Sequence, residues 1–176
     1  MELYRNEKTV IRPMEENDID LLVQGFREQN WDKPRELFER YYVEQTYQSR
    51  YVIIAVFDKN IAGYATILSS AKTGPFAGKG FPEITDFNVL IKYQRNGIGN
   101  LILDAAESIA GRISDIVSLG VGLHYGYGTA QRMYVKRGYI PDGSGVWYRN
   151  KQLEQYNDCC NDDDLVLYFS KSLKRG

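Results

Sequence analysis

The chain turns from a strand into a helix at Val89-Leu90-Ile91-Lys92-Tyr93-Gln94-Arg95-Asn96-Gly97-Ile98-Gly99, and this turn decides the fold. The apolar residues after it recur at the spacing of one helix face, at Ile98, Leu101, Ile102, Ala105, Ala106 and Ile109. The first N–H groups of a helix have no internal partner and carry partial positive charge. Glycine in the turn lets the backbone bend tightly and approach a ligand. The stretch therefore predicts a binding site for a phosphate group, most simply a pyrophosphate.

Three glycine-containing turns bind phosphate, and two of them do not fit. A P-loop ends in Gly-Lys-Ser/Thr, whereas this turn ends in Gly99-Asn100-Leu101. The dinucleotide fingerprint needs a third glycine, which neither Gly97-Ile98-Gly99 nor Gly120-Val121-Gly122 supplies. The remaining pattern is Gln/Arg-x-x-Gly-x-Gly/Ala, which Gln94 opens here. The alternative is a tight turn without a ligand.

A second motif lies further along the chain. The stretch Ile116–Val121 reads as a buried strand, and Ala130-Gln131-Arg132-Met133-Tyr134-Val135-Lys136-Arg137-Gly138-Tyr139 follows it. Together with the glycine turn, this segment resembles the two ordered motifs of the GNAT superfamily of N-acetyltransferases. The resemblance implies an α/β (α+β) fold, with a mixed, splayed sheet of about six to seven strands flanked by about four helices.

The remaining pattern of the chain agrees with this layout. The expected strands are 10–13, 51–57, 61–68, 84–91, 116–123, 145–149 and 165–170. The expected helices start near Asn17 and Pro34, at the glycine turn and near Thr129. We expect residues 1–176 to form a single domain, because this length suits one hydrophobic core.

The composition excludes several classes of partner. The formal net charge is −1, with 22 basic and 23 acidic side chains, so no basic excess indicates nucleic acid. No apolar run approaches the roughly 20 residues of a membrane span, and the N-terminus does not read as a signal peptide. We therefore expect a cytoplasmic protein without a membrane partner. The two cysteines, Cys159 and Cys160, lie in a polar stretch, and no metal site is expected.

The resemblance implies acetyl-CoA as co-substrate and assigns residues to it. Main-chain N–H groups of the glycine turn hold the pyrophosphate, the strand edge pairs with the pantetheine arm, and the N–H near Val89 donates to the thioester oxygen. Tyr127 stands where the family usually has asparagine, which requires a replacement contact near the sulfur. The expected cofactor residues are Phe87, Val89, Ile91, Gln94, Arg95, Asn96, Gly97, Ile98, Gly99, Asn100, Tyr127 and Ala130.

The resemblance also implies the catalytic groups. Tyr134 matches a tyrosine that passes a proton to the departing thiolate. For the base, Glu83 and Asp86 both lie near the start of the central strand, and in a regular strand they point to opposite faces. Glu83 is the expected base, because the matching family position often carries glutamate. His124 is a further alternative, as base or as holder of a water molecule.

The acceptor is expected to be a primary amine of a small molecule or a peptide. Its pocket would form from the first two helices, with Phe26, Trp31, Tyr41 and Tyr42 as lining. Two alternatives stay open: a non-catalytic module that binds acetyl-CoA as a sensor or holds a partner protein, and a longer acyl-CoA as donor. The closing strands could add to a neighbour's sheet edge, which would give a homodimer.

Overall fold

A computed structural model describes residues 2–174, which form four α-helices, nine strands and three short 3₁₀ turns. The hydrogen-bonded strand order is β1-β2-β3-β4-β5-β6-β9-β7-β8. The chain's contacts divide it into two compact units: one runs to Leu68 and adds Thr85–Ile109, and the other comprises Ser69–Ile84 and the chain from Ala110 onward. The strands are β1 (Tyr4–Arg5), β2 (Thr9–Pro13), β3 (Arg50–Phe57), β4 (Asn60–Leu68), β5 (Glu83–Val89), β6 (Ile116–Gly122), β7 (Ile140–Tyr148), β8 (Lys151–Gln152) and β9 (Leu165–Ser172).

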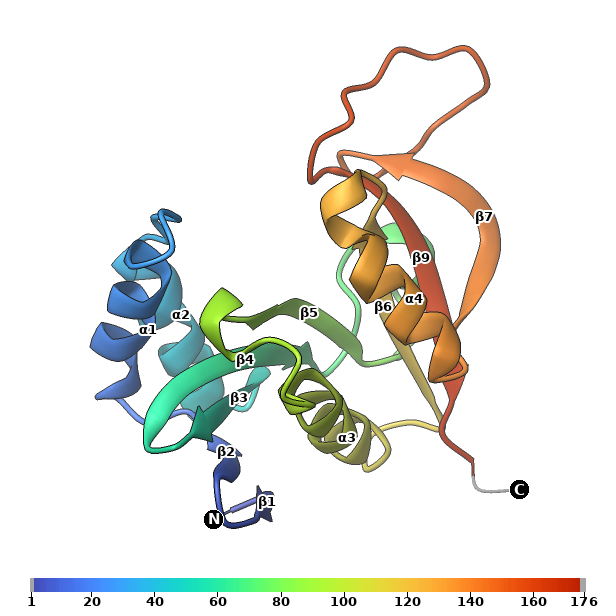
Figure 1. Cartoon of the computed structure of the whole chain (residues 1–176). Coiled ribbons are helices and arrows are strands. Elements are labelled where there is room, and N and C mark those ends of the chain that lie inside the picture. The colour runs from blue at the N-terminus through green and yellow to red at the C-terminus, as the bar shows by residue number, and fades with distance from the viewer. Residues whose placement is uncertain (1, 175–176) are drawn as a thin grey trace. The chain divides into compact units, whose positions relative to one another are not determined.

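The first unit is a layered α/β structure. Strands β2, β3 and β4 are antiparallel neighbours. Helices α1 (Asp18–Arg27) and α2 (Arg35–Thr46) lie on one side of these strands, and α3 (Ile98–Ala110) lies on the other (Figure 1). The core under α1 and α2 is apolar and aromatic, which explains why both helices cover this face: Met14, Ile19, Leu22, Phe26, Phe38, Tyr41, Val52, Ile54, Ile61, Tyr64 and Leu90 are all buried there.

Strand β5 crosses from one unit to the other. In the second unit its first two residues pair in parallel with β6, where Glu83 lies opposite Ser118. In the first unit it approaches β4 closely, because a Cβ on Gly63 would lie 2.4 Å from the main-chain oxygen of Asn88. Glycine at position 63 therefore sets how near the central strand can come to its neighbour.

The second unit is mostly antiparallel. Strand β9 pairs with β6 on one side and with β7 on the other. Helix α4 (Gly128–Lys136) lies against one side of these strands (Figure 1). This unit contains a small apolar cluster of Ala71, Phe76 and Tyr168.

The observed elements agree with most of the expected ones. Among the described residues the sheet has nine strands where about six to seven were expected, and two of the nine, β1 and β8, are only two residues long. The central strand ends at Val89 rather than Ile91, because Ile91 begins a short 3₁₀ turn over Ile91–Tyr93. No helix among residues 2–174 is long and apolar enough to cross a membrane.

Candidate functional site

The glycine turn has the backbone conformation of an exposed, tightly folded loop. Arg95 has a φ of 64° and Gly97 a φ of 76°, and both lie in the left-handed region. The Asn96 side chain fastens the turn by donating to the main-chain oxygens of Tyr93 and Gln94, at 3.1 Å each. Residues 94–97 are exposed, and a Cβ on Gly97 would meet nothing within 4 Å. The surface of the turn is therefore open to a ligand.

Helix α3 starts directly at this turn. Its first residue, Ile98, is buried and anchors the helix, while Asn100 is exposed. The N–H groups of Asn100 and Leu101 donate to the main-chain oxygen of Gly97, which closes the first turn. The N–H groups at the start of a helix have no partner inside it and favour an anion. The expected phosphate residues Gln94 to Asn100 are thus contiguous at one helix start.

The strand edge expected to hold an extended ligand is irregular. Pairing between β5 and β6 is confined to Glu83 and Ile84 among the described residues. Asp86 then has a φ of 42°, which interrupts the regular alternation of side chains. Phe87 and Val89 are half-buried beyond this point. Ile91 is 63% exposed, and its N–H already donates to Gln29 Oε1 at 3.0 Å, so only its side chain is open to a ligand.

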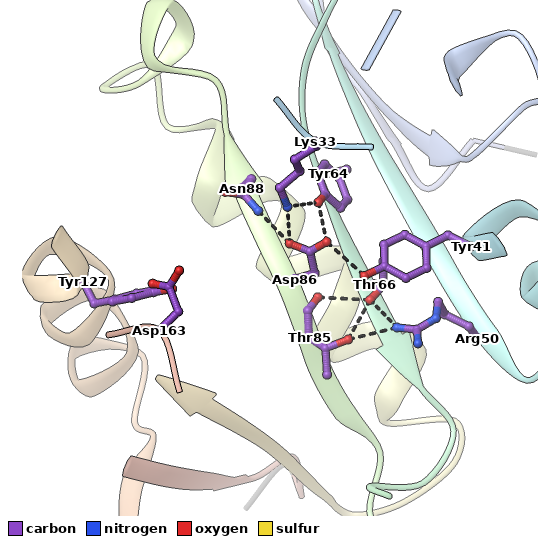
Figure 2. Close-up of polar contacts among 10 residues, drawn as sticks. All are labelled: Lys33, Tyr41, Arg50, Tyr64, Thr66, Thr85, Asp86, Asn88, Tyr127 and Asp163. Carbon is purple, nitrogen blue, oxygen red and sulfur yellow. Dashed lines mark hydrogen bonds and ion pairs between the residues drawn. The ribbon is translucent and has the colours of Figure 1, made fainter. Parts of the chain in front are cut away.

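Asp86 is the centre of a polar cluster (Figure 2). Its Oδ1 accepts from Lys33 Nζ at 2.6 Å and from Asn88 Nδ2 at 2.9 Å. Its Oδ2 accepts from the Tyr64 hydroxyl at 2.5 Å and the Tyr41 hydroxyl at 3.0 Å. Burial, followed by the charge of Asp86, raises the pKa of both tyrosines, so both phenols stay neutral donors.

A second chain of contacts supports the same strand. Arg50 Nη1 donates to the hydroxyls of Thr66 and Thr85, at 2.8 and 3.1 Å (Figure 2). The Arg50 guanidinium also lies 4.5 Å from the centre of the Tyr41 ring and pairs with Glu44 at 2.5 Å. These contacts join α2, β3, β4 and β5 and hold Tyr41 beside Asp86.

The structure places the expected acceptor residues unequally. Phe26 and Trp31 pack edge to face, with ring centres 5.4 Å apart, and both rings lie about 5 Å from Lys33 Nζ. Tyr41 donates a hydrogen bond to Asp86, as described above. Tyr42 is half-buried and packs against the core under α1 and α2 instead. Three of the four residues therefore gather around one polar centre.

The expected acid and base both lie in the second unit. Tyr134 is buried on α4, with its ring centre 5.7 Å from that of Tyr139. Burial raises the pKa of Tyr134. Ala130 is half-buried one turn earlier on the same helix. Glu83 is buried, and its charge adds to the burial that raises the pKa of Tyr168.

Tyr127 makes contacts that the sequence did not indicate. Its hydroxyl donates to Asp163 Oδ1 at 2.9 Å, and its ring centre lies 4.6 Å from that of His124. The Gly126 N–H donates to His124 Nδ1 at 3.1 Å, so Nε2 carries the hydrogen and donates to Asp163 at 3.0 Å. Both ring nitrogens of His124 are therefore engaged within the protein.

Sequence reasoning missed Lys33, Tyr64, Asn88 and Asp163 as members of these clusters. Lys33 lies in a short connection between α1 and α2, and Asp163 lies in an acidic stretch that resembles a solvated loop. Neither has a local pattern that indicates its partner. Tyr64 gave a weak signal, as a polar-tipped aromatic inside a buried strand.

Comparison with known proteins agrees with the geometry. A sequence profile of the acetyltransferase (GNAT) family matches residues 19–139. A search of curated proteins gives no match. Several solved structures share the fold at low sequence identity.

One such structure is a GNAT-family acetyltransferase from Desulfovibrio desulfuricans, 15% identical, with a TM-score of 0.70, covering 94% of this chain and 99% of its own. Another, from Salmonella typhimurium, modifies the N-terminal serine of ribosomal protein L7/L12; it is 10% identical, with a TM-score of 0.72 and coverage of 99% and 100%. A third, also from Salmonella typhimurium, was solved with its cofactor acetyl-CoA; it is 12% identical, with a TM-score of 0.69 and coverage of 97% and 96%.

Proposed function

The chain belongs to the acetyltransferase (GNAT) family and is an acyl-CoA-dependent N-acetyltransferase; from that premise we propose that it moves an acetyl group from acetyl-CoA to a primary amine of a small molecule or a peptide. The transfer is direct, with donor and acceptor bound together. The exposed turn over residues 94–97 at the start of α3 carries the proposal most directly. It has the open surface and the helix N–H groups that a pyrophosphate requires.

The residues around the turn fit acetyl-CoA, whose thioester supplies the activated acetyl group. The N–H groups between Gln94 and Asn100 hold the pyrophosphate, whereas those of Gln94 and Asn100 themselves donate to the main-chain oxygens of Ile91 and Gly97. The Arg95 guanidinium adds a charged donor. The edge of β5 beyond Ile84 pairs with the pantetheine arm, as an added strand does. The main-chain N–H near Val89 donates to the thioester oxygen and withdraws charge from the carbonyl.

The acceptor amine must lose a proton before it can attack. For an alkylammonium with a pKa of about 10.4 this costs about 4 to 5 kcal/mol at pH 7, and for an α-amine with a pKa of about 8 it costs about 1 kcal/mol. We assign Glu83 as the base that accepts this proton from the amine. Tyr134 holds a proton at its phenolic oxygen for the leaving sulfur, and its raised pKa keeps that proton in place at neutral pH.

The α-amine at the N-terminus of a peptide is one acceptor with the lower cost of deprotonation. The fold is shared with the enzyme that modifies the N-terminal serine of ribosomal protein L7/L12, which supports testing peptides beside small amines. The chain itself gives no sequence signal for a ribosomal-protein substrate.

The test combines binding with turnover. Calorimetric titration of the purified protein with acetyl-CoA, CoA, a longer acyl-CoA and ATP measures the donor preference. Thiol release is then followed with acetyl-CoA and a panel of alkylamines and peptides with free N-termini. We expect acetyl-CoA to bind and at least one amine to be acetylated, with Tyr134→Phe slowing that turnover. Absence of acetyl-CoA binding would refute the proposal, and binding without turnover of any amine would favour the non-catalytic alternative.

A further inference from the structure

The Lys33 side chain occupies a site built for an ammonium group. Its Nζ contacts Asp86 Oδ1 at 2.6 Å and the Tyr64 hydroxyl at 2.5 Å. Its side chain is only 9% exposed, although the residue lies in the connection between α1 and α2. Burying a lysine costs free energy unless the charge is compensated, so the surroundings of Lys33 must supply that compensation.

Three aromatic rings complete the enclosure. The Lys33 Nζ lies 5.1 Å from the centre of Phe26, 5.0 Å from Trp31 and 5.1 Å from Tyr64. Ring faces attract a cation most strongly where water is excluded, and proteins recognise quaternary ammonium ligands with a set of rings around one cation. Around the primary ammonium of Lys33, the Asp86 carboxylate and the Tyr64 hydroxyl add the hydrogen bonds that its N–H groups require. We call Phe26, Trp31, Tyr64 and Asp86 the ammonium cage.

The cage does not depend on Lys33 alone for its shape. Asp86 keeps three further donors, from Tyr41, Tyr64 and Asn88, and these come from α2, β4 and β5 (Figure 2). Phe26 is fully buried, and its contacts to Phe38 and Tyr64 are part of the helix core. The carboxylate would therefore stay in position if the lysine left.

Solvent reaches one wall of the cage. Trp31 is 46% exposed and lies in the same short connection as Lys33. The main-chain N–H of Lys33 donates a hydrogen bond to the main-chain oxygen of Trp31, two residues earlier, at 3.1 Å. Lys33 itself lies outside the helices and strands, in this connection.

We propose that the ammonium cage binds the acceptor amine in its protonated form, before that amine gives its proton to Glu83, and that Lys33 is an internal occupant which the acceptor displaces. The inference rests on the proposed function, since it names the chemical class of that acceptor. Exchange of one ammonium for another leaves Asp86 paired throughout, whereas a neutral or anionic ligand would leave this half-buried carboxylate without its cation. Lys33 thereby selects for amines that arrive protonated.

The test removes the occupant and supplies a free amine, without acetyl-CoA. Lys33→Met retains the length of the side chain but not its charge. We expect its melting temperature to rise with n-butylammonium chloride, and the wild type to show no comparable rise, because its site is filled. Potassium chloride at equal ionic strength and butan-1-ol serve as ligand controls. Lys33→Gln, whose amide can donate to Asp86, gives a second variant if Lys33→Met folds poorly.

A matched lysine separates the cage from general effects. Lys92 also pairs with a carboxylate, Glu28, at 2.8 Å and lies 5.2 Å from the Tyr93 ring, but its side chain is 54% exposed. Lys92→Met should gain no stability from n-butylammonium, and neither should the Lys33→Met, Asp86→Asn double variant. Equal responses in wild type and both Lys33 variants, or no response in either variant, would overturn the inference.

A kinetic measurement adds the link to the acceptor. With any amine found in the acceptor screen, Lys33→Met should lower KM about 100-fold or more, the factor expected if Lys33 leaves the site free in about one molecule in a hundred or fewer. A KM that stays the same or rises would overturn the inference. Failure of acetyl-CoA to bind would instead refute the proposed function, and it would leave the result with n-butylammonium unaffected.

Discussion

Substitution of Gly97 tests whether the turn over residues 94–97 binds a ligand or has a structural role alone. Gly97 has a φ of 76° and Gly78, in an exposed loop of the other unit, has a φ of 74°. Neither has an atom within 4 Å of the position that a Cβ would take. Gly97→Val and Gly78→Val therefore introduce the same backbone strain, about 1 to 2 kcal/mol, without a clash in the free protein. For a chain of this size we expect both melting temperatures to fall by about 2 to 8 °C.

Only Gly97→Val should weaken the binding of acetyl-CoA. A hydrogen bond to a charged group contributes about 1.5 to 3 kcal/mol, so loss of one contact between the turn and a phosphate weakens binding about 10- to 150-fold. Calorimetric titration of both variants with acetyl-CoA measures this difference at a temperature where both are folded. Equal dissociation constants for Gly97→Val and Gly78→Val would refute the assignment of the turn to the pyrophosphate.

Three further predictions follow from buried groups. Tyr134→Phe should lower kcat about 10²- to 10⁴-fold and leave acetyl-CoA binding unchanged. Because burial raises the pKa of Tyr134, its hydroxyl should still be protonated near pH 10, and the activity of the wild type should not fall there through loss of this proton. A fall in activity near pH 10 that is absent in Tyr134→Phe would count against the assignment of Tyr134 as the acid. Burial and Asp86 raise the pKa of Tyr64, so above pH 10 the unfolded chain releases a proton that the folded protein keeps. The free energy of unfolding then falls by about 1.4 kcal/mol per pH unit for this tyrosine, and urea titrations of Tyr64→Phe should show a slope smaller by that amount. Asp86→Asn leaves Lys33 buried without its anion and should cost about 3 to 5 kcal/mol in the same assay; a loss under 1 kcal/mol would mean that the pair is solvated.

The helices could be predicted closely, because their burial pattern is local. The spacing from Ile98 to Ile109 predicted a helix, and the structure has one over Ile98–Ala110. The two-residue strands β1 and β8 could not be predicted, since so short a segment has no periodicity. The end of β5 was predicted two residues late, because Leu90 is buried and Ile91 is apolar although 63% exposed.

The polar cluster shows a different limit. Glu83 and Asp86 were treated as members of a regular strand, which puts them on opposite faces. A φ of 42° at Asp86 breaks that alternation, and no residue type near position 86 announces it. The partners of Asp86 come from positions up to 53 residues away. Such contacts depend on the packing of α1 and α2 over the strands and have no counterpart in local spacing.

The conformation of Asp86 bears on why a carboxylate stands there. A left-handed non-glycine residue within a strand costs about 1 to 3 kcal/mol. A half-buried carboxylate such as Asp86 adds a desolvation cost unless cations and donors surround it. Glycine at position 86 would remove both costs, because glycine adopts a positive φ without strain and has no carboxylate. The irregular backbone therefore does not by itself require an aspartate. The chain instead supplies Asp86 with a lysine, two tyrosine hydroxyls and an amide. Strain and burial that local structure does not require are typical of functional sites, and here they coincide on the one carboxylate that faces the ammonium of Lys33.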